Sequence, residues 1–251
     1  MSEAELTLAE WPFTGTSDEF LKRVGILPLA HQPGERWLYH TSCEILGVLI
    51  ARVSGKSLGT FLRERIFETL RMKDTGFSLP EGKLDRLPPC YGRDFSGKIV
   101  VLHEARNGHY ARPPVFESGG GGLVSTVDDM AIFGLMMLNT TYGRKRILSR
   151  PSIELMTRDH LTAEQKASSP FFENFWTTRG WGFGMSVMTE HHDLEHVPGR
   201  FGWDGTFGPS WYVDPKEQLV GVLMIQRRPD VLNLPVITHD FWTSAYQLID
   251  E

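Results

Sequence analysis

Tyr39 stands directly ahead of a strongly amphipathic stretch, GERWLYHTSCEILGVLIARVSGKSLGTFLRERIF (34–67). A phenol at a helix N-terminus feels the positive end of the helix dipole, which favours the phenolate and suits proton transfer. The alternative is a tyrosine that only packs where the chain enters the helix. Tyr39 is therefore the first candidate for acid–base chemistry in this chain.

Two other groups resemble ligand-binding motifs and fail on spacing. His191, His192, Asp193 and His196 lack the helical spacing of a zinc motif, so we expect a solvated loop and no metal. The glycine run 119–122 is not followed by Lys-Ser/Thr, so it does not match a phosphate-binding loop. We expect no cofactor.

Helical spacing and cap residues predict several helices in the first two-thirds of the chain. Thr41 and Glu44 have the spacing of a capping box, and Gly55 occupies the position of a left-handed C-cap. A short strand is expected at 99–102. The other expected helices are one opened by Ser17 with Phe20, Leu21 and Val24 on one side, one over 57–70, one capped by Ser125 and Asp128 and ending at Leu138, and one near Pro151.

From Trp181 the apolar period changes to two, which predicts a half-buried strand over 181–187. SWYV and LVGVLMIQ, separated by residues 214–217, predict an antiparallel hairpin, and THDFWTSAYQLIDE predicts a closing helix. We therefore expect one α+β domain over 1–251, with a helical region at about 17–160 and a sheet with its terminal helix at about 180–251.

Composition excludes several classes of protein. The formal net charge is −5 and the charged fraction is 23%, so no basic face for nucleic acid is expected. No apolar run approaches the roughly 20 residues of a membrane span. The acidic start MSEAELTLAEW does not resemble a signal peptide, which favours a cytoplasmic protein. Cys43 and Cys90 are expected to be free thiols.

Four stretches in a fixed order resemble one known family. They are Tyr-x-Thr (39–41) ahead of a helix ending in VSGKSL, then IFETLRMKDTGF, GGGGLVSTVDDMAIFG and GWDGTFGPSWYVDPKEQLVGVLMIQ. From about Pro28 to its end the chain resembles the serine β-lactamase-like hydrolases, in the branch of class C β-lactamases, D-alanyl-D-alanine peptidases and related carboxylesterases. The resemblance implies a β-lactamase/transpeptidase-like fold and acyl transfer on a small-molecule ester or amide.

The resemblance also implies roles for particular residues. The family's catalytic elements are Ser-x-x-Lys, Tyr-x-Asn and Lys-Thr-Gly, and Tyr39 matches the proton-relaying tyrosine. Thr41 stands in place of Asn, where capping the helix is the favoured role. Trp203, Asp204 and Gly205 stand in place of Lys-Thr-Gly, so a cation is lost and an apolar wall is gained, which favours uncharged esters. Thr206 would offer its backbone N–H to an oxyanion, and a structural turn is the alternative.

The Ser-x-x-Lys element is missing, because no serine in this sequence has a lysine three residues later. Only 38 residues precede Tyr39, so the chain resembles the C-terminal two-thirds of such an enzyme. We expect weak or absent ester hydrolysis. A non-catalytic binding role and a longer gene are the alternatives, and an in-frame Ser-x-x-Lys upstream of Met1 would show the latter. A sheet without its first strands has an open edge, so we also expect self-association.

Overall fold

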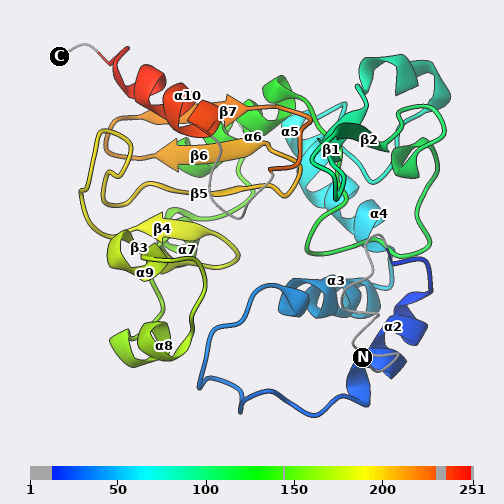
Figure 1. Ribbon diagram of the computed structural model, residues 1–251, viewed down its shortest axis with the longest axis horizontal. Coiled ribbons are helices and arrows are strands. Elements are labelled where there is room, and N and C mark those ends of the chain that lie inside the picture. The colour runs from blue at the N-terminus through cyan, green and yellow to red at the C-terminus, as the bar shows by residue number, and fades with distance from the viewer. Residues whose placement is uncertain (1–12, 144, 230–235, 250–251) are drawn as a thin grey trace.

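A five-stranded antiparallel sheet forms the centre of the larger part of the molecule (Figure 1). The computed structural model describes residues 13–143, 145–229 and 236–249. The strands lie in chain order across the sheet, each paired antiparallel with the next. They are β3 (Arg179–Trp181), β4 (Ser186–Met188), β5 (Phe201–Asp204), β6 (Ser210–Asp214) and β7 (Leu219–Leu223).

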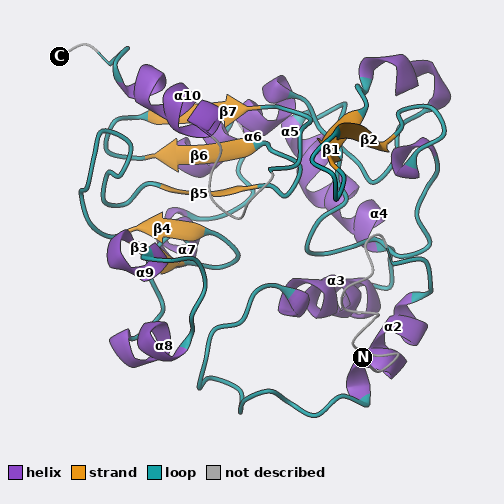
Figure 2. Cartoon of the chain, in the orientation of Figure 1, coloured by secondary structure: helices purple, strands orange, loops and turns teal. Residues whose placement is uncertain are grey.

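Along the chain, helices precede the sheet and one helix follows it. Figure 2 distinguishes helices, strands and loops by colour. A separate two-stranded sheet is formed by β1 (Cys90–Arg93) and β2 (Ile99–His103), which pair antiparallel. The elements are α2 (Ser17–Gly25), α3 (Thr41–Ser54), α4 (Leu58–Leu62), a π-helical turn (Arg63–Phe67), α5 (Glu68–Leu70), a 3-10 helix (Glu81–Arg86), β1 (Cys90–Arg93), β2 (Ile99–His103), a 3-10 helix (His109–Ala111), α6 (Val127–Asn139), α7 (Arg150–Met156), α8 (Ala163–Ser168), α9 (Phe175–Thr178) and α10 (Val236–Tyr246).

Each face of the sheet carries its own apolar core, because successive strand residues point to opposite faces. On one face Phe201 and Val213 pack in a cluster with Met136 of α6. On the other face Tyr212 packs against Trp242 of α10, with ring centroids 5.4 Å apart. The α+β class and the terminal helix that covers the sheet are thus confirmed.

Most predicted elements are present, with small shifts at their caps. Thr16, one residue before the expected opening serine, caps α2 in a capping box with Glu19. Gly55 ends α3 with φ of +67°, as expected. The helix over 57–70 forms as three consecutive helical segments that begin after Ser57. Thr126, not Ser125, caps α6.

The capping box of Thr41 and Glu44 is wrong. Thr41 is the first residue of α3, and the N-cap residue His40 makes no side-chain cap bond. Glu44 is buried instead and turns away from the helix end to bind the glycine run, where it accepts a hydrogen bond from Ser118 Oγ at 2.7 Å. A carboxylate that satisfies buried donors elsewhere is not available to cap its own helix.

The apolar residues that recur at helical spacing along α3 are largely exposed in the described structure; they are Ile45, Leu46, Leu49, Ile50 and Val53. Val48 packs with Phe20 of α2 and with Phe116, so the helix is held to the rest of the molecule on that side. Exposed fractions are 53% for Leu49 and 81% for Val53. Helical spacing thus identified the helix, but most of these apolar side chains are not buried by other described residues.

The single strand expected over 181–187 is wrong, because two short strands and a turn occupy this stretch. The Gly182 N–H bonds to the carbonyl of Met185 at 2.8 Å, and Gly184 has φ of +82°. Phe183 projects from the turn with 52% of its surface exposed. A turn that alternates glycine with apolar residues has the same period of two as a strand.

Three further expectations concern the cysteines, membrane spans and the edges of the sheet. Cys43 and Cys90 are free thiols. Among the described residues no single helix is long and apolar enough to cross a membrane, and the pair 41–54 and 58–70 meets that requirement only jointly, across a 77° bend. Within the described sheet, β3 and β7 are the edge strands.

Candidate functional site

The structure brings Tyr39 and Trp203 together from distant parts of the chain. Tyr39 lies two residues before α3, and Trp203 lies in β5, one residue from its end. The indole Nε1 of Trp203 donates a hydrogen bond to the phenol oxygen of Tyr39 at 2.9 Å. Two sequence-predicted site residues therefore meet directly, and the bond fixes the direction in which the phenol points.

An aromatic cluster surrounds this pair. The Tyr39 ring lies 5.5 Å from the Trp203 ring, 5.5 Å from Phe171 and 6.0 Å from Trp37, measured between centroids. Trp181 joins Trp203 and Trp37 edge to face, at 4.8 and 4.7 Å. Edge-to-face contacts at this spacing are the favoured arrangement of aromatic pairs. The site is consequently walled by aromatic rings.

The electrostatics of Tyr39 differ from the expectation. Burial by the surrounding rings raises the pKa of the phenol above its ordinary value, while the hydrogen bond from Trp203 opposes that shift. The helix dipole was expected to favour the phenolate, but desolvation of the anion is the larger effect here. Tyr39 is therefore a protonated phenol at neutral pH, although 42% of its surface stays exposed.

Asp204 does not face the Tyr39–Trp203 pair. As the next residue on β5 it points to the opposite face of the sheet, where its carboxylate accepts hydrogen bonds from Ser210 Oγ at 2.5 Å and Tyr212 OH at 2.8 Å. Burial raises the pKa of this carboxyl, against the lowering effect of those hydrogen bonds and of two arginines. Ser210 also accepts from Trp242 Nε1, so Asp204 belongs to the contact between the sheet and α10.

Gly205 and Thr206 lie in the turn between β5 and β6. The N–H of Gly205 bonds to the carbonyl of Pro209 at 2.7 Å, which closes the turn. Thr206 is exposed at the tip. Thr41 stands two residues after Tyr39, in the first turn of α3. Their expected substrate-binding roles stay predictions.

Sequence reasoning missed the contact that fixes the start of α3. Glu44 accepts hydrogen bonds from Ser118 Oγ and, at 2.9 Å, from the N–H of Gly119. A Cβ at Gly119 would lie 2.1 Å from the carbonyl oxygen of Cys43, so only glycine allows this approach. The glycine run therefore allows a close contact between its backbone and the backbone of α3. Its composition indicated such a contact but not the segment that it approaches.

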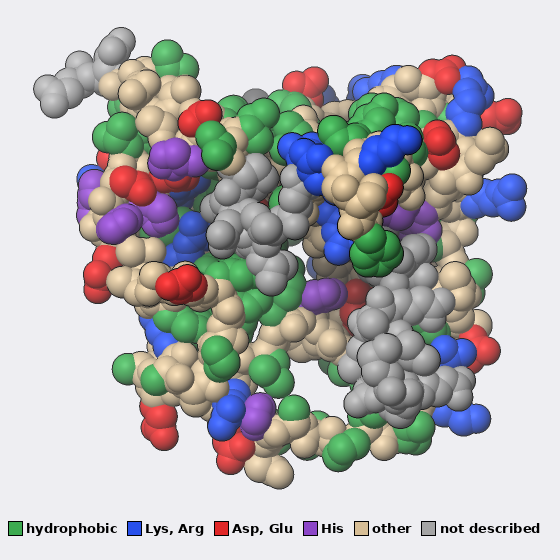
Figure 3. Space-filling view, in the orientation of Figure 1, with side chains coloured by type: hydrophobic (Ala, Val, Ile, Leu, Met, Phe, Trp, Pro, Cys, Tyr) green, Lys and Arg blue, Asp and Glu red, His purple; other side chains and the backbone are tan. Residues whose placement is uncertain are grey.

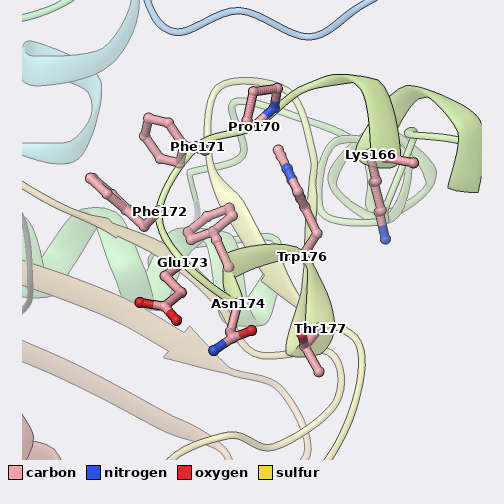
Figure 4. Close-up of a pocket in the computed structure, with 10 residues that line it drawn as sticks. Lys166, Pro170, Phe171, Phe172, Glu173, Asn174, Trp176 and Thr177 are labelled. Atoms are coloured by element: carbon pink, nitrogen blue, oxygen red, sulfur yellow. The ribbon is translucent and has the colours of Figure 1, made fainter.

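A hollow of about 490 Å³ adjoins the aromatic cluster. Figure 4 shows its wall, which the chain builds between α8 and the end of α9. Phe171 lines this hollow and also contacts Tyr39, so one ring joins the two features. The face shown in Figure 3 is also hollowed beside the surface over α8 and α9. Phe171 and Trp181 carried no motif, so the sequence did not identify them.

The histidine-rich loop is more ordered than a solvated loop. Donor atoms of Asp193, Glu195 and His196 all lie within 4.8 Å of one another, and Glu195 is buried. Protein groups occupy these donors: His196 Nδ1 lies 2.7 Å from Asp193 Oδ1, and Glu195 contacts Arg200 and His239 Nδ1. Two such pairings and a neighbouring guanidinium disfavour a bound cation, and the expected absence of a metal stays a prediction.

Comparison with known proteins gives a consistent result. The family model described as Beta-lactamase matches residues 3–236. Protein Rv1367c of Mycobacterium tuberculosis is 34% identical over 226 residues, which cover 88% of this chain and 56% of that protein. Esterase EstB of Burkholderia gladioli is 28% identical, over 78% of this chain and 51% of its own length.

A solved structure agrees in fold. Unliganded simvastatin synthase (LovD) from Aspergillus terreus, in its selenomethionyl form, superposes with a TM-score of 0.74 at 24% identity, covering 93% of this chain and 62% of the synthase. This likeness confirms the β-lactamase/transpeptidase-like fold that the resemblance implied. The chain spans about half the length of the curated relatives it matches.

Proposed function

Because the chain belongs to the beta-lactamase family, we propose that its Tyr39–Trp203 pair is part of an esterase-type acyl-transfer site. The observation that carries the proposal is the 2.9 Å hydrogen bond between these two residues, which sets the phenol in a fixed direction beside a ring-lined wall. In acyl transfer a serine oxygen adds to the ester carbonyl as its proton leaves. Tyr39 would relay that proton to the departing alcohol, and water would then release the acyl group as an acid.

The residues near Tyr39 favour uncharged esters as substrates. Trp203 supplies an indole where a cation would hold a substrate carboxylate, and aromatic rings form the rest of the wall. An apolar wall stabilises an alkyl or aryl group but offers no favourable electrostatic interaction to an anion. A neutral ester is therefore preferred over a carboxylate-bearing lactam in this proposal.

The same proposal includes low activity for the isolated chain. No Ser-x-x-Lys occurs in the sequence, and burial raises the pKa of Tyr39 above its ordinary value of 10.0. A phenol that is protonated at neutral pH is a poor proton acceptor. Turnover of a short-chain nitrophenyl ester should consequently be weak or absent. Robust turnover that Tyr39→Phe abolishes would overturn this part and require a nucleophile that the sequence does not reveal.

A second candidate is a site that binds its ligand without chemistry, and the raised pKa of Tyr39 favours it. It predicts binding of a neutral ester analogue without covalent labelling by a serine-directed fluorophosphonate. A serine labelled in stoichiometric amount would exclude this candidate and support the catalytic one.

We also propose self-association through an edge of the sheet, because β7 has no further strand beside it among the described residues. Unpaired N–H and C=O groups at such an edge can pair with a second copy. Small-angle scattering that gives a monodisperse monomer would count against this assembly.

A further inference from the structure

The hollow beside the aromatic cluster is built by one short stretch of chain. Its lining consists of Lys166, Ala167 and residues 170–177, and Figure 4 shows Phe171, Phe172 and Trp176 around it. A volume of about 490 Å³ lies in the range of small-molecule sites. No motif in the sequence marks this stretch as a site.

The lining of the hollow suits a neutral, ring-containing ligand. Phe172 and Phe175 present rings, and Phe171 lies 4.1 Å from Phe172 between centroids. The cation of Lys166 is already paired with Asp159 at 2.5 Å, so it offers little to an anionic ligand. Glu173 adds an exposed negative charge at the rim, which disfavours anions further.

The hollow is connected to the Tyr39–Trp203 pair through two shared rings. Phe171 stacks near Trp203 with centroids 6.2 Å apart, and Phe175 meets Trp203 at 6.0 Å. A ligand with its carbonyl at the phenol of Tyr39 would reach the hollow only with a group that extends past one of these shared rings. An acetyl group is shorter than this, whereas an aryl or fused-ring group extends further.

We propose that this hollow holds the bulky, ring-containing hydrocarbon group of a neutral ester, and that Phe171 is the specificity-determining residue. The inference rests on the proposed function, since it names the substrate class of the same site. It predicts selection by the size and neutrality of the group beside the ester, through stacking on Phe171 and exclusion of carboxylates.

Equilibrium dialysis of the full chain tests the inference without turnover. The probe is methyl naphthyl ketone, which keeps the carbonyl and the fused rings but cannot be hydrolysed. We expect it to bind about tenfold or more tightly than naphthoate, and Phe171→Ala to weaken its binding about tenfold. Phe95→Ala is the matched control, because this phenylalanine is fully exposed on the β1–β2 turn, and it should leave binding unchanged.

Phe171→Leu provides a second variant that keeps the apolar volume and loses the ring, and it should bind the ketone with intermediate affinity. Equal binding by Phe171→Ala and the parent chain, or equal binding of ketone and naphthoate, would overturn the inference. Ester turnover without ketone binding would also overturn it and leave the proposed function standing. Ketone binding that depends on Phe171, without fluorophosphonate labelling, would support the inference and remove the catalytic role.

Discussion

The indole N–H of Trp203 reaches the phenol oxygen of Tyr39 across 164 residues of sequence, at 2.9 Å. This bond ties the entry of α3 to the end of β5, which are otherwise joined by ring contacts. A hydrogen bond to the oxygen stabilises the phenolate more than the phenol, while the surrounding rings do the opposite. The pKa of Tyr39 therefore depends on a balance that single substitutions can shift.

Replacing Trp203 by phenylalanine should raise the pKa of Tyr39 further. The ring would remain as an apolar neighbour, but the N–H that stabilises the anion would be lost. NMR titration of carbon-labelled tyrosine rings would measure the shift, with Tyr39→Phe to assign the signal. Trp181→Phe is the control, because Trp181 contacts the Tyr39 ring without bonding to its oxygen. A lower pKa in Trp203→Phe would contradict the prediction.

Replacing Glu44 by glutamine should destabilise the protein by about 1–3 kcal/mol. The carboxylate is buried and accepts hydrogen bonds from Ser118 Oγ and the N–H of Gly119, and an amide cannot accept both with the same two oxygens. Denaturant unfolding would measure the change. Glu154→Gln removes a surface pair with Arg150 and should have little effect. Equal losses in the two variants would show that Glu44 does not hold the glycine run.

Gly119→Ala should cost several kcal/mol or prevent folding. The added Cβ would lie 2.1 Å from the carbonyl oxygen of Cys43 and 3.1 Å from Cα of Gly47, so the backbone of α3 or of the glycine run must move. Gly82→Ala is the control, because its Cβ would meet no atom within 4 Å. Thermal unfolding should show a clear loss for the first variant and none for the second. A stable Gly119→Ala protein would mean that this approach is not as close as described.

Local pattern predicted what local forces decide. Glycine at position 55, the hairpin across 214–217 and the closing helix each follow from a turn residue or a regular period, and each is present. The turn after Trp181 was missed, because glycine and apolar residues alternate there as in a strand. That residues 1–251 form one domain stays a prediction.

The site was only half predictable. Motif order pointed to Tyr39 and Trp203, and the structure places them in contact. The motifs did not indicate Phe171, because a ring that comes from a loop belongs to no regular spacing in the sequence. The direction in which the pKa of Tyr39 shifts was predicted wrongly. The helix dipole is a local feature that the sequence shows, whereas the rings that desolvate the phenol come from distant segments.

Asp204→Asn should change how stability depends on pH. Burial holds the folded-state pKa of this carboxyl above its ordinary value of 3.8, so between those two pKa values the folded chain binds more protons than the unfolded chain. The carboxyl consequently lowers the free energy of unfolding as pH rises through that interval, and the amide removes this loss. The variant should therefore gain stability relative to the parent as pH rises from acid to neutral, in denaturant unfolding at a series of pH values. Asp94→Asn should change in the opposite direction, because the hydrogen bond from Ser96 lowers the pKa of Asp94. Parallel pH profiles for the parent and Asp204→Asn would contradict the burial of this carboxyl on the sheet face opposite Trp203.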